Sequence, residues 1–127
     1  MHDTSFPHAA KRVSSIKIWR NVEIIRYGDV GATFAVMPGT SKTEKPILLL
    51  AHLDVVEAKR EDWVRDPFTL IEENGYFYAR GTADDKAMAA AWVDTLIRFK
   101  QEGFKPKRTL KLALTCGEET TYAFNGA

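Results

Sequence analysis

The sequence lacks the features that mark secreted, membrane-spanning or nucleic-acid-binding proteins. Cys116 is the one cysteine among 127 residues, so no disulfide can form within the chain, as is typical of a reducing compartment. No apolar run approaches the roughly 20 residues that span a bilayer, and the N-terminal region has no apolar signal-peptide core. The net charge of +1 lacks the basicity of a nucleic-acid binder. We therefore expect a cytoplasmic protein with no membrane or nucleic-acid partner.

The composition is that of an ordinary folded domain. Apolar residues make up 45% of the chain and charged residues 28%, which is typical of globular proteins and argues against disorder. A chain of 127 residues is long enough to bury a single hydrophobic core. One domain is therefore expected.

The pattern of apolar residues predicts alternating strands and helices. A helix is predicted over Lys86 to Gln101, where apolar side chains recur at helical spacing, and a hairpin around Asn74-Gly75, a favoured two-residue turn. A weaker pattern predicts a short helix over 8–20. Strands are predicted at 22–27, 32–37, 47–51 and 109–116. This order predicts an α/β fold with a mixed, largely parallel sheet and flanking helices. The continuous apolar run 47–51 further predicts a strand buried on both faces.

Three groups of acidic or imidazole side chains stand at the ends of predicted elements. His52 and Asp54 follow the strand at 47–51, and the stretch "GTADDKA" leads into the predicted helix. Glu118 and Glu119 follow the strand at 109–116. Functional residues of open α/β sheets gather beyond the carboxyl ends of strands, so we expect these three groups to converge.

Each group also has a plainer interpretation when taken alone. A His-x-Asp sequence is often incidental, Asp84-Asp85 can cap the helix that follows, and paired glutamates usually lie in solvent. Taken together, one imidazole and several carboxylates suit zinc. The chain has no GxSxG, Walker, CxxC or dinucleotide motif that would indicate another chemistry.

Zinc chemistry assigns a role to each side chain. The His52 imidazole can ligate through one nitrogen while Asp54 accepts a hydrogen bond from the other. Asp84 can hold one metal or bridge two. Of the two adjacent glutamates, one can ligate while the other takes a proton from water. The residues therefore indicate a zinc hydrolase.

Four stretches in the same order resemble one known family. These are "LLLAHLDVVEA", the W-x(3)-PF segment Trp63 to Phe68, "GYFYARGTADDKA" and "TCGEET". They are similar to the zinc-dependent metallopeptidases that include glutamate carboxypeptidase, aminoacylase, bacterial dipeptidases, acetylornithine deacetylase and succinyl-diaminopimelate desuccinylase. The resemblance runs from about residue 22 to residue 127.

The resemblance implies specific roles and a substrate class. His52 would be a zinc ligand oriented by Asp54, Asp84 would bridge two zincs, Glu118 would be the general base, and Glu119 would ligate the second zinc. Cobalt or manganese could replace zinc. The substrate would be a dipeptide or N-acyl amino acid, cleaved at an amide bond beside a free carboxylate.

The sequence departs from the family pattern in two places. Ala87 stands where the family usually has glycine. Residues 1–127 correspond to a single partial catalytic domain, because the family continues with further ligands, a lid or dimerisation domain and a C-terminal catalytic segment. The resemblance therefore implies one zinc or none on this chain alone, weak or no turnover, and association with itself or with a complementing chain. The alternatives are a non-catalytic binding or assembly module derived from that domain, or one half of a split enzyme.

Overall fold

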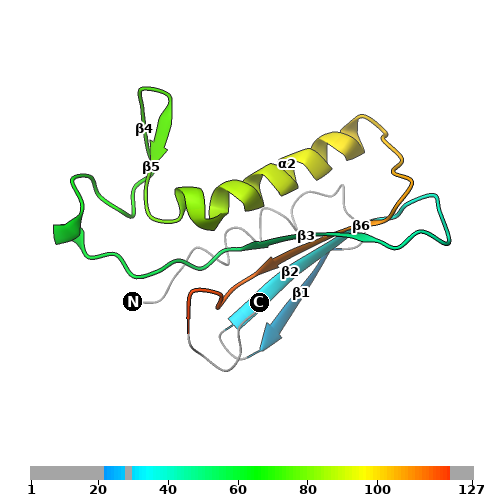
Figure 1. Cartoon of the computed structure of the whole chain (residues 1–127), viewed down its shortest axis with the longest axis horizontal. Coiled ribbons are helices and arrows are strands. Elements are labelled where there is room, and N and C mark those ends of the chain that lie inside the picture. The colour runs from blue at the N-terminus through cyan, green and yellow to red at the C-terminus, as the bar shows by residue number, and fades with distance from the viewer. Residues whose placement is uncertain (1–21, 28–29, 121–127) are drawn as a thin grey trace.

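A four-stranded sheet, one helix and a separate hairpin make up the described part of the chain (Figure 1). The computed structural model describes residues 22–27 and 30–120, and the helix predicted over 8–20 lies outside them. The strands are β1 (Val22–Tyr27), β2 (Val30–Met37), β3 (Ile47–His52), β4 (Ile71–Glu73), β5 (Tyr76–Tyr78) and β6 (Leu110–Thr115). The helical segments are η1 (Arg60–Asp62), η2 (Thr82–Lys86) and α2 (Ala87–Gln101).

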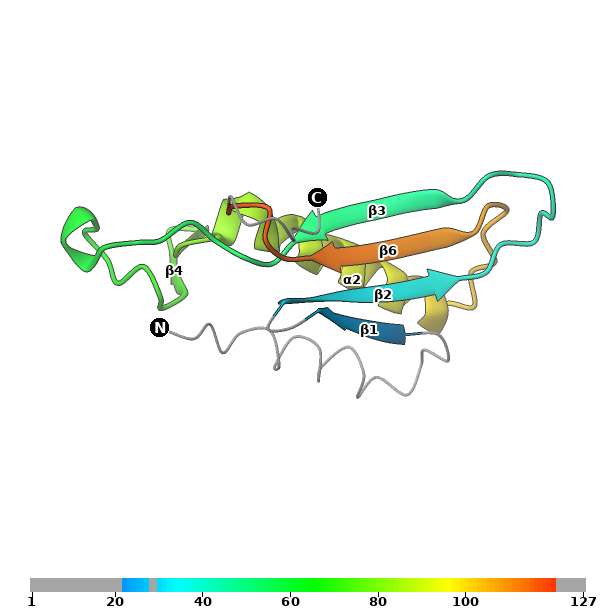
Figure 2. The same ribbon diagram turned by 90° about the horizontal axis from the view of Figure 1, so that it is seen from below.

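The sheet has the order β1-β2-β6-β3, with the four strands side by side in Figure 2. A mixed sheet was predicted and is confirmed, but "largely parallel" is wrong for the described strands. β1 pairs antiparallel with β2, as does β2 with β6, and the β3–β6 pair alone is parallel. A connection of two residues between β1 and β2 permits an antiparallel pair, whereas the long crossover from β3 to β6 through α2 permits a parallel one.

The helix α2 packs along one face of the sheet and closes the core (Figure 1). Every second side chain of β6 points toward it, as the two-residue period of a strand requires. Leu96 lies at the centre of this contact and is 1% exposed. The buried cluster consists of Ala35, Met37, Ala51, Ala89, Leu96, Leu110, Leu112 and Leu114. In the described residues, α2 is the one helix that flanks the sheet.

The prediction that residues 47–51 are buried on both faces is wrong. Leu48 is 59% exposed and Leu50 is 50% exposed, while Ala51 is 2% exposed. Successive side chains of a strand point to opposite faces, and among the described residues α2 covers one face of the sheet; the outermost position of β3 adds to the exposure. Leu49 and Ala51 pack toward the core, and Leu48 and Leu50 alternate with them on the opposite face.

The predicted hairpin and the remaining boundaries agree closely with the structure. β4 and β5 pair around Asn74 and Gly75, both with positive φ (54° and 79°), as an Asn-Gly turn requires. Both α2 and β6 begin one residue later than predicted, and β2 begins two residues earlier than predicted. No helix in the described ranges has the length and apolarity needed to cross a membrane.

Replacing Leu96 with alanine should destabilise the fold by about 2–5 kcal/mol, because the side chain is fully buried and the neighbouring strand cannot collapse into the space. Met88 lies on the same helix but is 44% exposed, so Met88→Ala should cost less than about 1 kcal/mol. Urea denaturation of the three proteins measures both values. Equal destabilisation by the two substitutions would contradict this description of the core.

Candidate metal centre

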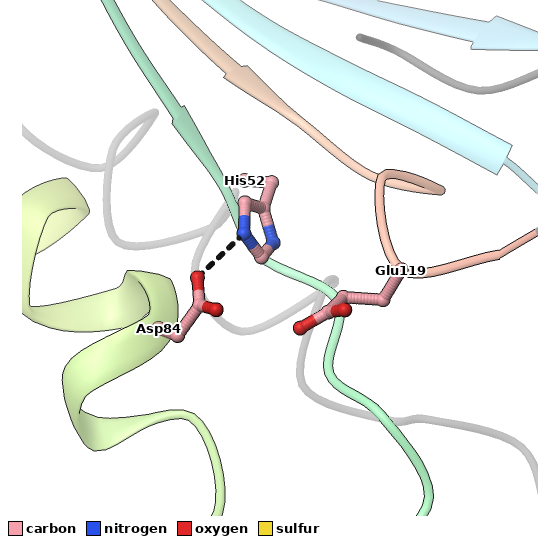
Figure 3. A group of neighbouring side chains, drawn as sticks. All are labelled: His52, Asp84 and Glu119. Atoms are coloured by element: carbon pink, nitrogen blue, oxygen red, sulfur yellow. Dashed lines mark hydrogen bonds and ion pairs between the residues drawn. The ribbon is translucent and has the colours of Figure 1, made fainter.

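The parallel pairing of β3 and β6 places the carboxyl ends of both strands at the same end of the sheet. His52 is the last residue of β3 and pairs in register with Thr115 of β6. Glu118 and Glu119 follow β6 within four residues. Asp84 lies in η2, which directly precedes α2 in the chain and packs against this end of β3. Figure 3 shows side chains from all three segments pointing toward one another.

His52 lies at the centre of the group and is largely shielded from solvent. Its Nε2 lies 3.0 Å from Oδ1 of Asp84 and 3.8 Å from Oε2 of Glu118. The His52 side chain is 12% exposed, against 76% for Asp84 and 47% for Glu118. The imidazole is therefore held by the fold, with carboxylates on its solvent side.

Both ring nitrogens of His52 face oxygen acceptors. Nδ1 lies 3.2 Å from the main-chain oxygen of Asp54 and 3.5 Å from its Oδ1, while Nε2 faces the Asp84 carboxylate. A neutral imidazole carries one N–H and can donate from one nitrogen. If Nδ1 donates to Asp54, the lone pair of Nε2 faces a carboxylate oxygen at 3.0 Å. Either a second proton or a cation must lie between them.

The pKa of His52 reflects the same arrangement. Burial of the ring lowers this pKa, but the hydrogen bonds to Asp84 and to the main chain of Asp54, with the negative charges of Asp54 and Glu118, outweigh burial. The net effect raises the pKa above its ordinary value. The surroundings of His52 therefore stabilise positive charge.

Three side chains can offer one ligand atom each to a metal ion at this point. The ligand atoms of His52, Asp84 and Glu119 all lie within 4.8 Å of one another. Metal–ligand bonds of about 2.0–2.2 Å in a tetrahedral zinc site place ligand atoms roughly 3.4 Å apart, so the Nε2–Oδ1 separation already suits a shared ion. Imidazole nitrogens and carboxylate oxygens are both ligand types that zinc accepts in proteins. These residues therefore fit a metal ion.

Asp54 connects the chain that follows β3 to the chain that follows β6. Its Oδ2 accepts a hydrogen bond of 2.9 Å from the main-chain N–H of Glu119. Its Oδ1 is buried and has no hydrogen-bond partner among the described residues, and it lies 3.5 Å from Nδ1 of His52. The structure thus places Asp54 beside His52 and Glu119. The catalytic or ligand roles of the predicted site residues remain predictions; these residues are His52, Asp54, Asp84, Glu118 and Glu119.

Asp85, which the sequence suggested only as a possible helix cap together with Asp84, is a further neighbour of His52. Its Oδ2 accepts a hydrogen bond of 3.2 Å from the main-chain N–H of His52. The alternative of a helix cap for Asp84-Asp85 is not seen, since no side chain caps η2 or α2. Instead the backbone leaves helical geometry at Asp84 (φ −121°, ψ 100°) and Asp85 (φ −131°, ψ 18°). The Asp-Asp pair was the available signal, but the acceptor role required knowledge of which strand lies at the edge.

Gly81 allows η2 to approach the chain that follows β3. Its φ is 83°, in the left-handed region that favours glycine. A Cβ at this position would lie 2.5 Å from Cγ1 of Val55. Any other residue at position 81 would be strained at this φ and would force either Val55 or the Gly81 turn to shift.

Comparison with known proteins identifies the family. Residues 48–127 match peptidase family M20/M25/M40. The chain belongs to this family. It is 38% identical over 88 residues to human Aminoacylase-1, covering 68% of this chain and 22% of that protein. It is 40% identical over 80 residues to a Beta-Ala-Xaa dipeptidase from Lactobacillus delbrueckii subsp. lactis, covering 62% of this chain and 17% of that protein.

The fold of this M20-family chain is also that of part of a solved dipeptidase. Human carnosine dipeptidase 1 superposes with a TM-score of 0.72 at 22% identity, over 97% of this chain and 29% of the other. This likeness confirms the predicted fold class. The chain spans about a fifth of the length of the curated relatives it matches.

Zinc titrated into the metal-free chain should bind near one ion per chain. His52→Ala and Asp84→Ala should each weaken zinc affinity by at least 10-fold, because each removes a ligand atom. Asp94→Ala removes an exposed carboxylate in the middle of α2 and should leave the affinity unchanged. Isothermal titration calorimetry measures all four. Zinc binding that survives both substitutions would place the ion elsewhere.

Proposed function

We propose that this chain contributes the metal-binding part of an active site that hydrolyses an amide bond in a dipeptide or N-acyl amino acid, with zinc as the metal. The observation that supports this most directly is the convergence of His52, Asp84 and Glu119, with their ligand atoms within 4.8 Å of one another. The substrate class is suggested by the names of two relatives, an aminoacylase and a dipeptidase. Both names denote hydrolysis of an amide bond.

His52, Asp84 and Glu119 would hold the zinc. When bound, zinc supplies a Lewis acid that polarises a carbonyl and makes water more acidic. We propose one zinc on this chain, because the described residues offer three protein ligands around one point. A second zinc, with Asp84 as the bridge, would draw on ligands outside the described residues. Cobalt or manganese would be alternative metals.

Glu118 is proposed as the general base. Its Oε2 lies 3.8 Å from Nε2 of His52 and its side chain is 47% exposed, so it borders the ligand group on the side open to solvent. A carboxylate there can accept a proton from the attacking water as the C–O bond forms. It can then return that proton to the leaving nitrogen as the C–N bond breaks, which releases a carboxylate and an amine.

Asp54 is proposed to orient the imidazole. Its main-chain oxygen and Oδ1 both face Nδ1 of His52, at 3.2 Å and 3.5 Å. A proton held on Nδ1 by these oxygens would leave the lone pair of Nε2 free for the metal. The same carboxylate accepts the Glu119 N–H, so the positions of two proposed ligands depend on it.

We further propose that residues 1–127 form one partial catalytic domain, which is cytoplasmic and has weak or no turnover by itself. Self-association or a complementing chain would supply what the described residues do not. Leu48 and Leu50 are exposed on the face of the sheet opposite α2, which is consistent with a partner over that face.

Glu118→Gln should separate proton transfer from metal binding. We expect it to lower the rate of hydrolysis of N-acetyl amino acids and dipeptides by about 10²–10⁴-fold, with zinc affinity unchanged. Glu102 is an exposed glutamate at the far end of α2. Glu102→Gln is therefore the matched control and should change neither the rate of hydrolysis nor the zinc affinity. Assays of the zinc-loaded chain, alone and with any complementing chain, measure the rate.

Two results would contradict the proposal. Hydrolysis by Glu118→Gln at the wild-type rate would exclude Glu118 as the base. Tight zinc binding by the wild type with no hydrolysis of either substrate class, in any preparation, would favour the non-catalytic binding module.

A further inference from the structure

His52 ends a strand whose outer edge has no partner strand in the described part of the chain. Along β3, the N–H groups of Ile47 and Leu53 donate to main-chain oxygens of Thr109 and Thr115, at 2.9 Å and 2.8 Å. Main-chain groups of a parallel strand alternate between its two neighbours. The N–H of His52, at an even position, therefore points away from β6, toward the free edge.

The free edge is where α2 and η2 make their polar contacts with β3. The main-chain oxygen of Leu50, two residues before His52, accepts a hydrogen bond of 3.4 Å from Nε1 of Trp92 in α2. The N–H of His52 donates to Oδ2 of Asp85 in η2 at 3.2 Å. An amide that would otherwise be left without an acceptor is thus paired with a half-buried carboxylate.

This contact joins two segments that each carry a proposed ligand. Asp85 is next to Asp84 in the chain, and the N–H that it accepts belongs to His52 itself. The hydrogen bond therefore limits how far the Asp84 carboxylate can move from the imidazole. The close approach of Gly81 to Val55 holds the other end of the same turn.

We propose that Asp85 is a positioning residue, which sets the separation of His52 and Asp84 by accepting the main-chain N–H of His52. This inference rests on the proposed metal site. It assigns Asp85 no direct bond to the metal and no proton transfer. The carboxylate acts through the backbone of one ligand and the chain connection to the other.

The test compares Asp85→Ala, which removes the acceptor, with Asp85→Asn, which keeps a carbonyl oxygen at the same place. Asp94→Ala is the control for loss of an aspartate near the same helix. In the metal-free chain, amide hydrogen exchange at His52 should be at least 10-fold faster in Asp85→Ala and close to wild type in Asp85→Asn. This measurement needs no metal, so it decides the inference even if the wild type binds none.

With metal, Asp85→Ala should bind zinc about 10–100-fold more weakly and change the visible absorption spectrum of bound Co²⁺. Asp85→Asn should restore both properties to near the wild-type values. Unchanged exchange at His52, or wild-type metal affinity and Co²⁺ spectrum in Asp85→Ala, would overturn the inference. Equal loss in both variants would also overturn it, because the charge of Asp85 and not its acceptor oxygen would then matter. Failure of the wild type to bind metal would instead refute the proposed function.

Discussion

The parallel pairing of β3 with β6 is the constraint on which the rest of the site depends. It places His52 opposite Thr115, so the chain leaving β6 passes the imidazole and brings Glu118 and Glu119 to it. An antiparallel pair in the same position would put the carboxyl ends of the two strands at opposite ends of the sheet. The crossover that permits the parallel pair contains α2, and the residues that lead into α2 contribute Asp84. One topological feature thus delivers all three segments to one place.

The local geometry is then fixed by hydrogen bonds between carboxylates and main-chain amides. Asp85 accepts the N–H of His52, and Asp54 accepts the N–H of Glu119. Each of these contacts links two of the three segments. The result is an imidazole with oxygen acceptors at both nitrogens, so a neutral ring that carries its proton on Nδ1 needs a cation beside Nε2. A bound metal ion meets that requirement without a second proton on the ring.

Much of this arrangement could be predicted from the sequence because it depends on periodicity and on local signals. The helical spacing after Lys86 and the Asn-Gly turn each determine an element almost to the residue. The convergence of His52, Asp84 and Glu119 followed from the rule that strand ends gather functional residues. These inferences use patterns within a few residues of one another.

The errors arise where pairing over long distances decides the outcome. The run 47–51 is equally apolar in a central strand and in an edge strand, so the exposure of Leu48 and Leu50 could not be inferred from it. The direction of the β2–β6 pair likewise depends on which strands meet. The acceptor role of Asp85 was missed for the same reason, since it exists because β3 has a free edge beside η2.

The central claim is that one metal ion binds between β3, η2 and the end of β6. Anomalous diffraction at the zinc edge, from crystals of the zinc-loaded chain, tests it most directly. We expect one peak in bonding contact with Nε2 of His52 and with carboxylate oxygens of Asp84 and Glu119, with Glu118 and Asp85 outside bonding distance. A peak that lacks His52, a peak bonded to Asp85, or no peak at this position in zinc-containing crystals would contradict it.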